Sequence, residues 1–326
     1  MAETAVVTGA GGFIGGHLAT ALVRRGSHVR AFLRYNSRGD RGSLEWHDQH
    51  VVRDMEVIFG DLRDVESVGR AITGADVVFH LGAQIAIPYS YVNARDFFET
   101  NVLGTLNVAE AALRAGVRRV VHTSTSEVYG TARTVPMTED HPLEAHSPYA
   151  ASKIGGDKLM DAFFRSHRLP VTVLRPFNTY GPHQSTRAVT ATIVTQALAG
   201  KTLLLGELDT RRDLTFVSDT VAGFIAAAES DAAVGRTVHL GTGNDVSVAE
   251  LVAVVGELLG HRLAVEVDDT RLRPPLSEVR RLVSNPALAH ELIGWNPKVD
   301  LGAGLSATIR WIESNMSRFR IGEYSR

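Results

Sequence analysis

The chain has 326 residues, of which 44% are hydrophobic and 21% charged, and a formal net charge of −2. This balance is typical of a globular protein and gives no electrostatic reason to bind nucleic acid or an anionic membrane. Because cysteine is absent, disulfides, thiolate metal sites and a cysteine nucleophile are excluded. The sequence has neither an apolar stretch of membrane-spanning length nor a secretory leader, so we expect a cytoplasmic protein.

Short β-branched segments alternate with helical patterns through the first half of the chain. The predicted strands are 4–8, 28–33, 56–59, 76–80, 118–123 and 171–175, and the predicted helices are 13–25, 64–72, 94–115 and 149–168. Apolar strands that alternate with helices indicate a parallel sheet covered on both faces. The sequence therefore predicts an α/β fold with a doubly wound (Rossmann) sheet, which binds ligands at the carboxyl ends of its strands.

The pattern loosens after residue 176. Further elements are predicted at 188–199 (helix), 202–205 (strand), 214–229 (strand and helix) and 236–240 (strand), followed by three more helices. We expect a dinucleotide-binding domain from residues 1–175 with a returning segment at about 212–240. The remainder, 176–211 and 241–326, is expected to form a smaller C-terminal α/β substrate lobe.

A charged, glycine-containing segment at 34–50 interrupts the pattern near the N-terminus and is predicted to be a surface loop. It ends in "HDQH" (47–50), whose two histidines have the spacing of metal ligands. Because no further ligand is near them in the sequence, we expect no metal site.

A glycine-rich turn joins the first strand to the first helix. In "VVTGAGGFIGGHL" (6–18), Gly9 permits a tight turn, Gly12 lets the backbone approach a pyrophosphate, and Gly15 lets helix and strand pack closely. The start of the helix, at Phe13 and Ile14, offers free N–H groups to an anion. The turn therefore predicts dinucleotide binding.

The third and fourth strands end in residues that suit the adenosine half of such a cofactor. Asp61 in "GDL" (60–62) is placed to accept a hydrogen bond from an adenine amino group, and Leu62 follows it. "FHLGAQ" (79–84) brings small residues to a point where backbone lies against a ribose, so we expect contacts from Leu81 and Ala83.

The second strand lacks the acid that binds a ribose 2′-hydroxyl in NAD enzymes. The segment "VRAFLRYNS" (29–37) offers Arg34 instead, and a guanidinium pairs well with a 2′-phosphate. This favours NADP, while an exposed loop arginine is the alternative, so NAD or NADP remains open.

Tyr149 and Lys153 are spaced to lie on one face of the helix predicted at 149–168. An ammonium group near a phenol lowers the pKa of the phenol, which makes the tyrosine a usable general base. The same helix contains Gly155 and Gly156, each of which costs about 1 kcal/mol relative to alanine. We interpret the two glycines as a point of close backbone approach.

The chain resembles the extended short-chain dehydrogenase/reductase family, in particular its nucleotide-sugar epimerases and dehydratases. The similar segments are TGAGGFIG (8–15), HLGAQ (80–84), NVLGT (101–105), TSTSEVYG (123–130), YAASK (149–153), RPFNTYGP (175–182) and RRDLTFVSD (211–219). Within the family it is most similar to 4,6-dehydratases of nucleotide-linked amino sugars, such as those of legionaminic acid pathways.

The resemblance implies a role for each matching residue. Thr125 would hydrogen-bond the sugar at C4, Tyr149 would remove the O4 proton, and Lys153 would bind the nicotinamide ribose. Glu127 would remove the C5 proton once a 4-keto group has acidified it, and Asn101 would support the hydrogen-bond network around the cofactor. Implied contacts with the nucleotide-sugar substrate come from Gln84, Thr125, Asn178, Arg187, Arg212, Arg273 and Glu278.

One position departs from the pattern of the dTDP-glucose dehydratases. They carry an aspartate between the threonine and the glutamate, and this chain has Ser126. The Thr-Ser-Glu order is similar to GDP-mannose dehydratases and to UDP-glucuronate decarboxylases. A 4,6-dehydratase is the first prediction, a 4-epimerase or decarboxylase is the second, and a non-catalytic dinucleotide-sensing protein is the third.

The resemblance also implies a homodimer. Family members pair the helices predicted here at about 94–115 and 149–168 into a four-helix bundle.

Overall fold

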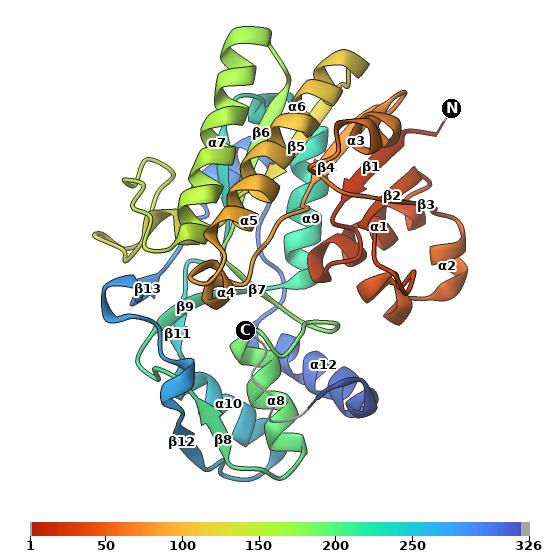
Figure 1. Ribbon diagram of the computed structural model, residues 1–326. Coiled ribbons are helices and arrows are strands. Elements are labelled where there is room, and N and C mark those ends of the chain that lie inside the picture. The colour runs from red at the N-terminus through yellow and green to blue at the C-terminus, as the bar shows by residue number, and fades with distance from the viewer. Residues whose placement is uncertain (1, 321–326) are drawn as a thin grey trace.

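The computed structural model describes residues 2–320. Its centre is a parallel sheet in the strand order β10-β6-β5-β4-β1-β2-β3, which confirms the doubly wound α/β class (Figure 1). The strands of this sheet are β1 (Thr4–Thr8), β2 (His28–Arg34), β3 (Glu56–Gly60), β4 (Val77–His80), β5 (Arg119–Thr123), β6 (Val171–Pro176) and β10 (Thr237–Leu240). The first six lie where the sequence predicts strands.

Helices cover both faces of the sheet. One apolar core forms between the sheet and α1 (Phe13–Arg24), α9 (Val217–Glu229) and α11 (Ala287–Ile293). The opposite core forms under α3 (Val65–Ile72), α6 (Gly104–Ala115) and α7 (Pro148–His167). Alternate residues of β1 serve the two cores: Val7 belongs to the first and Val6 to the second. This two-sided burial explains why the strand is apolar throughout.

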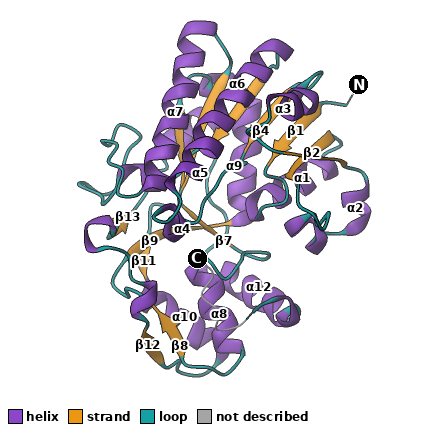
Figure 2. Ribbon diagram, in the orientation of Figure 1, coloured by secondary structure: helices purple, strands orange, loops and turns teal. Residues whose placement is uncertain are grey.

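A smaller lobe is built on the carboxyl side of the sheet. The strand β9 (Arg211–Phe216) pairs with β7 (Asn178–Tyr180), β11 (Asp245–Ser247) and β13 (Arg281–Leu282), while β8 (Leu203–Leu205) pairs with β12 (Val265–Val267). The helices α8 (Val189–Leu198), α10 (Val248–Leu259) and α12 (Leu301–Glu313) pack with β8 into one apolar core, and these elements lie in the lower part of the molecule in Figure 2.

The returning segment rejoins the main sheet later than the sequence suggests. From about residue 217 onward, α9 and β10 belong to the main sheet and its core, whereas β9 pairs with strands of the smaller lobe. The reason is that the hydrogen-bonding edges of β9 are used by β7, β11 and β13.

Two other regions also differ from the sequence prediction. The segment 34–50 is not simply a surface loop, because Gly42–Trp46 forms a 3-10 helix (η1) with Leu44 fully buried, and α2 (Gln49–Arg53) follows. The helix predicted at 94–115 consists of α5 (Ala94–Phe98), a π-helical turn η2 (Glu99–Leu103) and α6. A short helix, α4 (Ile87–Ser90), precedes it. Among the described residues, none of the helices combines the length and hydropathy that a bilayer span requires.

Candidate active site

The glycine-rich turn at the end of β1 has the geometry of a dinucleotide loop. Gly9 has φ +72°, and a Cβ there would lie 2.8 Å from the backbone of Gly82, at the end of the neighbouring strand. A Cβ on Gly15 would lie 2.2 Å from the Gly9 carbonyl oxygen. Gly12 caps α1 without a side chain, so the N–H groups at Phe13 and Ile14 remain open to an anion. These residues fit the pyrophosphate of a dinucleotide.

The residues predicted for the adenosine end lie at neighbouring strand ends. Arg34 ends β2 and is exposed, and Asp61 follows β3, the next strand in the sheet. The Arg63 guanidinium pairs with the Asp61 carboxylate at 2.6 Å and, with a smaller contribution from Arg34, holds the pKa of that carboxyl below its usual range. Leu62 is fixed by the Asn107 side-chain amide, which donates to its carbonyl at 2.8 Å.

The segment after β4 is held against the glycine-rich turn and against α5–α6. Leu81 donates its N–H to the Thr8 carbonyl at 3.2 Å, which brings the stretch containing Ala83 beside Gly9. Asn101, in the π turn, accepts from the Gln84 N–H at 2.7 Å and donates to the Gln84 carbonyl at 2.9 Å. Because π turns place side chains out of the normal helical phase, they are frequent at functional sites.

Thr125 and Tyr149 meet between β5 and α7. Thr125 follows β5 and caps a 3-10 helix, η3 (Ser126–Tyr129), by accepting the Glu127 N–H at 3.2 Å. Tyr149 lies in the first turn of α7, which Ser147 caps, and its hydroxyl hydrogen-bonds Thr125. The two hydroxyls therefore form the pair that the resemblance implies for binding a sugar alcohol.

Burial is the largest influence on the pKa of Tyr149. Burial raises the pKa of Tyr149, and its hydrogen bond with Thr125 offsets this only in part. The Lys153 ammonium donates to the Thr123 carbonyl at 2.5 Å, and burial lowers the pKa of Lys153 to about 8. The effect of the Lys153 ammonium on the Tyr149 phenol therefore stays a prediction.

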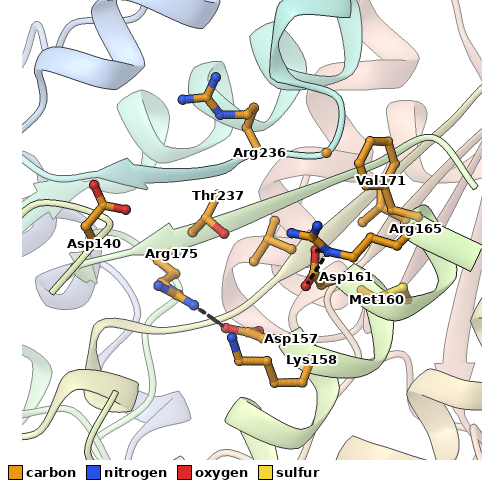
Figure 3. A pocket seen from close by; sticks show the side chains of 13 residues that line it. Asp140, Asp157, Lys158, Met160, Asp161, Arg165, Val171, Arg175, Arg236 and Thr237 are labelled. Atoms are coloured by element: carbon orange, nitrogen blue, oxygen red, sulfur yellow. Dashed lines mark hydrogen bonds and ion pairs between the residues drawn. The ribbon is translucent and has the colours of Figure 1, made fainter. Parts of the chain in front are cut away.

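Asp157, which the sequence interpretation missed, lies one turn beyond Lys153 and organises a buried polar network. It accepts from the Ser124 hydroxyl at 2.7 Å and pairs with the Arg175 guanidinium at 2.9 Å (Figure 3). Its charge raises the pKa of Lys153 against the effect of burial. The signal that would have identified it is the i,i+4 spacing from Lys153, which continues the spacing from Tyr149 to Lys153.

Figure 3 shows the pocket of about 300 Å³ that this network lines. Its walls come from α7, β6 and β10, and none of Thr125, Glu127, Tyr149 or Lys153 lines it. The pocket is therefore distinct from the position where a sugar would meet Tyr149.

Glu127 and the predicted anion-binding residues form one charged group. The Glu127 carboxylate lies 3.4 Å from the Arg273 guanidinium, and Arg212 lies 3.8 Å from Glu278. Burial lowers the pKa of Arg212, while Glu127 and Glu278 partly restore it. Since the charge of Glu127 also acts on Tyr149, the group adjoins the Thr125–Tyr149 pair.

Three other predicted substrate residues are placed differently. Asn178, in β7, and Arg187, in the loop before α8, are exposed and belong to the smaller lobe. The Gln84 side-chain amide donates to the Asp96 carboxylate at 2.7 Å, so its donor is occupied within the chain. Tyr91, which the sequence analysis did not select, hydrogen-bonds Ser277 at 2.7 Å. Burial raises the pKa of Tyr91, and the Ser277 hydrogen bond and the charge of Arg273 offset this only in part.

Gly155 and Gly156 have an explanation within the chain. A Cβ on Gly155 would lie 3.0 Å from Val102, and one on Gly156 would lie 3.2 Å from the Asn101 carbonyl. The glycines therefore let α7 approach the π turn that carries Asn101, whose side chain donates to Ser152 of α7 at 2.9 Å. They need no partner subunit to account for them.

The chain is similar to known proteins over nearly its whole length. The sequence model of the GDP-mannose 4,6 dehydratase family matches residues 6–308. A dTDP-glucose 4,6-dehydratase of Streptomyces griseus is 35% identical, with 96% of this chain and 94% of the relative covered. A UDP-glucose 4-epimerase of Mycolicibacterium smegmatis is 34% identical, covering 95% of this chain and 98% of the relative.

Solved structures show the same similarity. The dTDP-glucose 4,6-dehydratase DesIV of Streptomyces venezuelae, solved with NAD and TYD bound, superposes with a TM-score of 0.86 at 31% identity, covering 97% of this chain and 99% of that one. MoeE5 in complex with UDP-glucose and NAD gives a TM-score of 0.84 at 31% identity, covering 96% and 99%. The chain is an enzyme of the extended short-chain dehydrogenase/reductase family and belongs to its nucleotide-sugar dehydratases and epimerases.

Proposed function

We propose that the protein is a nucleotide-sugar 4,6-dehydratase. The observation that carries this proposal is the position of Glu127. Its carboxylate is buried and close enough to Tyr149 to raise the pKa of that phenol, and its backbone N–H donates to the Thr125 hydroxyl. A dehydratase needs a second base beside the site of C4 oxidation, and Glu127 supplies one.

The first step is oxidation of the sugar at C4. Thr125 and Tyr149 orient the C4 hydroxyl, and Tyr149 accepts its proton. When bound, the oxidised nicotinamide supplies the hydride acceptor for C4 and later the hydride donor for C6, and its positive charge favours the phenolate. Lys153 holds the nicotinamide ribose, and the charge of Asp157 raises the pKa of its ammonium.

The second step is elimination of water between C5 and C6. The C4 carbonyl acidifies the C5 proton, and Glu127 removes this proton and passes it to the C6 hydroxyl, which leaves as water. When hydride is returned to C6, Glu127 delivers a proton from water to C5. The ion pair with Arg273 at 3.4 Å orients the Glu127 carboxylate for this step. Because the cofactor returns to its starting state, the reaction has no net redox change.

The substrate diphosphate is assigned to Arg212 and Arg273. Guanidinium groups pair with two phosphate oxygens in a planar fork, and both side chains are largely buried near Glu127. Glu278, beside Arg212, is placed to accept from the nucleotide ribose. Asn178 and Arg187 complete the proposed contacts from the smaller lobe.

A 4-epimerase is the second candidate, and a specific observation favours it. Ser126 stands where dTDP-glucose dehydratases carry an aspartate, so the leaving C6 hydroxyl lacks that acid. The match to a named UDP-glucose 4-epimerase over 98% of its length supports the same alternative. A UDP-glucuronate-type decarboxylase would use the same C4 oxidation.

Incubation with UDP-, GDP- and dTDP-sugars followed by mass spectrometry separates these reactions. A product lighter by one water supports the dehydratase, and an isomer of unchanged mass supports the epimerase. Loss of carbon dioxide from a glucuronate substrate identifies a decarboxylase. If no sugar nucleotide of any of the three bases is converted, the proposal is wrong.

The cofactor preference and the assembly are also proposals. Relatives solved with NAD support NAD, whereas the exposed Arg34 and the missing acid after β2 support NADP. The dinucleotide released by denaturing the purified protein decides between them.

We infer a homodimer formed through α5–α6 and α7, because Phe98 and Leu103 on this surface are 44% and 52% exposed. Light scattering measures the dimer directly.

A further inference from the structure

Three histidines from distant parts of the sequence meet outside the site described above. His17 lies in α1, His47 follows the 3-10 helix η1, and His183 lies in the loop between β7 and α8. One ring nitrogen from each lies within 4.8 Å of the other two. The "HDQH" segment contributes only His47, and the fold supplies the two partners that the sequence did not reveal.

One distance in the cluster is close to that between two ligands of one metal ion. His47 Nε2 and His183 Nδ1 are 3.1 Å apart and form a hydrogen bond in the absence of an ion. Two nitrogens bound tetrahedrally to zinc at about 2.0–2.1 Å are roughly 3.3 Å apart, so a shift of a few tenths of an ångström suffices. His17 Nδ1 donates to the Phe13 carbonyl at 3.0 Å, and this fixes the tautomer that leaves Nε2 free to bind a metal.

The chain makes room for these rings at a cost. A Cβ on Gly16 would lie 2.5 Å from the Ser43 hydroxyl oxygen and 2.9 Å from His47 Nε2, so α1 carries a glycine, an unfavourable helical residue, where Ser43 and His47 approach. His183 has φ +70°, a left-handed conformation that non-glycine residues rarely adopt. Backbone strain of this kind clusters at binding sites.

Aromatic side chains lie beside the cluster. The ring centroids of Trp46 and Trp311 are 6.0 Å and 4.5 Å from that of His183, with Trp46 edge-on and Trp311 tilted. Apolar side chains would serve simple packing better, whereas histidines direct nitrogen lone pairs toward a common point.

We propose that His17, His47 and His183 bind one divalent transition-metal ion of the zinc class, with water as the fourth ligand. Imidazole ligands suit zinc, copper and nickel, whereas magnesium and calcium require oxygen ligands, and none of the three residues supplies one. The site is separate from Tyr149 and Glu127, so the ion has no part in the sugar chemistry.

The ion would join the cofactor loop to the smaller lobe. The Ser43 hydroxyl, four residues before His47, donates to the Gly12 carbonyl at 2.6 Å. His183 lies in the loop that leads to α8, and Trp311 belongs to α12; both helices are in the smaller lobe. A metal here therefore stabilises the contact between the two lobes.

Zinc binding to tag-free, chelator-treated full-length protein tests this proposal by titration calorimetry. We expect one zinc per chain, with affinity at least about 100-fold weaker in His47→Ala and His183→Asn. Asn tolerates the left-handed backbone of His183. His50→Ala is the matched control, because His50 is exposed in the adjacent helix and should leave the affinity unchanged.

Two further measurements do not depend on the variants or on enzyme activity. Cobalt added to the wild-type protein should give the intense visible absorption of a tetrahedral site. Zinc at 100 times its dissociation constant should raise the melting temperature of the wild type by about 4 °C. The proposal is overturned if the wild type binds no zinc stoichiometrically, if cobalt gives only a weak octahedral spectrum, or if both histidine variants bind zinc as the wild type does.

Discussion

Replacing Asp157 by asparagine should destabilise the protein far more than the same change one turn further along α7. Asp157 and its partner Arg175 have side chains only 4% and 6% exposed, at 2.9 Å. Removing one partner of a buried ion pair leaves the other charge uncompensated, which costs about 3–5 kcal/mol. Asp161 pairs with Arg165 at the same 2.9 Å, but these side chains are 40% and 74% exposed (Figure 3). An exposed i,i+4 pair contributes only about 0.3–0.5 kcal/mol.

Urea unfolding followed by circular dichroism measures both variants under identical conditions. Asp157→Asn should lower the free energy of unfolding by about 4 kcal/mol, equivalent to a fall of about 6 °C in melting temperature for a chain of this size. Asp161→Asn should remain within about 0.5 kcal/mol of the wild type. Equal effects of the two variants would refute the assignment of Asp157 to a buried, charge-paired network.

The remaining predictions concern the cofactor, the chemistry and the response to pH. Tyr149→Phe should reduce kcat by about 10²–10⁴-fold while the dinucleotide stays bound, since the base is lost and the fold is not; unchanged turnover would exclude this base. Gly15→Ala should abolish dinucleotide retention, measured in the denatured supernatant, because its Cβ would lie 2.2 Å from a loop carbonyl; Gly69→Ala, where a Cβ meets nothing within 4 Å, is the control. Arg34→Ala should weaken NADP binding more than NAD binding in fluorescence titrations, and equal effects would show that Arg34 contacts no 2′-phosphate. Burial lowers the pKa of His239 to about 3, so between pH 3 and 6.5 the unfolded chain binds the extra proton. Stability should therefore fall by about 2 kcal/mol from pH 7 to pH 5, and His239→Gln should remove that part of the fall in urea titrations.

The sequence predicts the sheet and the cofactor turn because both depend on local patterns. Continuous apolar runs, suited to two-sided burial, mark β1 to β6. In the turn, Gly9 has a positive φ, and a Cβ on Gly12 or Gly15 would lie close to the Gly9 carbonyl. The Tyr149–Lys153 spacing likewise places both side chains on one face of α7.

What could not be predicted depends on contacts between distant segments. The Glu127–Arg273 ion pair joins residues 146 positions apart, and only the path of the second lobe brings them together. The pKa of Tyr149 depends on burial, which spacing alone does not reveal. The sequence analysis did not predict the three-histidine cluster for the same reason, because His17, His47 and His183 lie on separate elements.

The π turn at Glu99–Leu103 has a consequence for how this part of the chain can vary. Such a turn is equivalent to one residue inserted into an α-helix, and one residue rotates everything after it by about 100°. Before the turn, Phe97 faces the core; within it, Asn101 faces Gln84; after it, Val108 and Ala112 face the sheet. A regular α-helix could not direct Phe97, Asn101 and the sheet-facing residues of α6 to their partners at the same time. Deleting a single residue here would therefore turn either the Asn101 amide away from Gln84 or the apolar face of α6 away from the sheet.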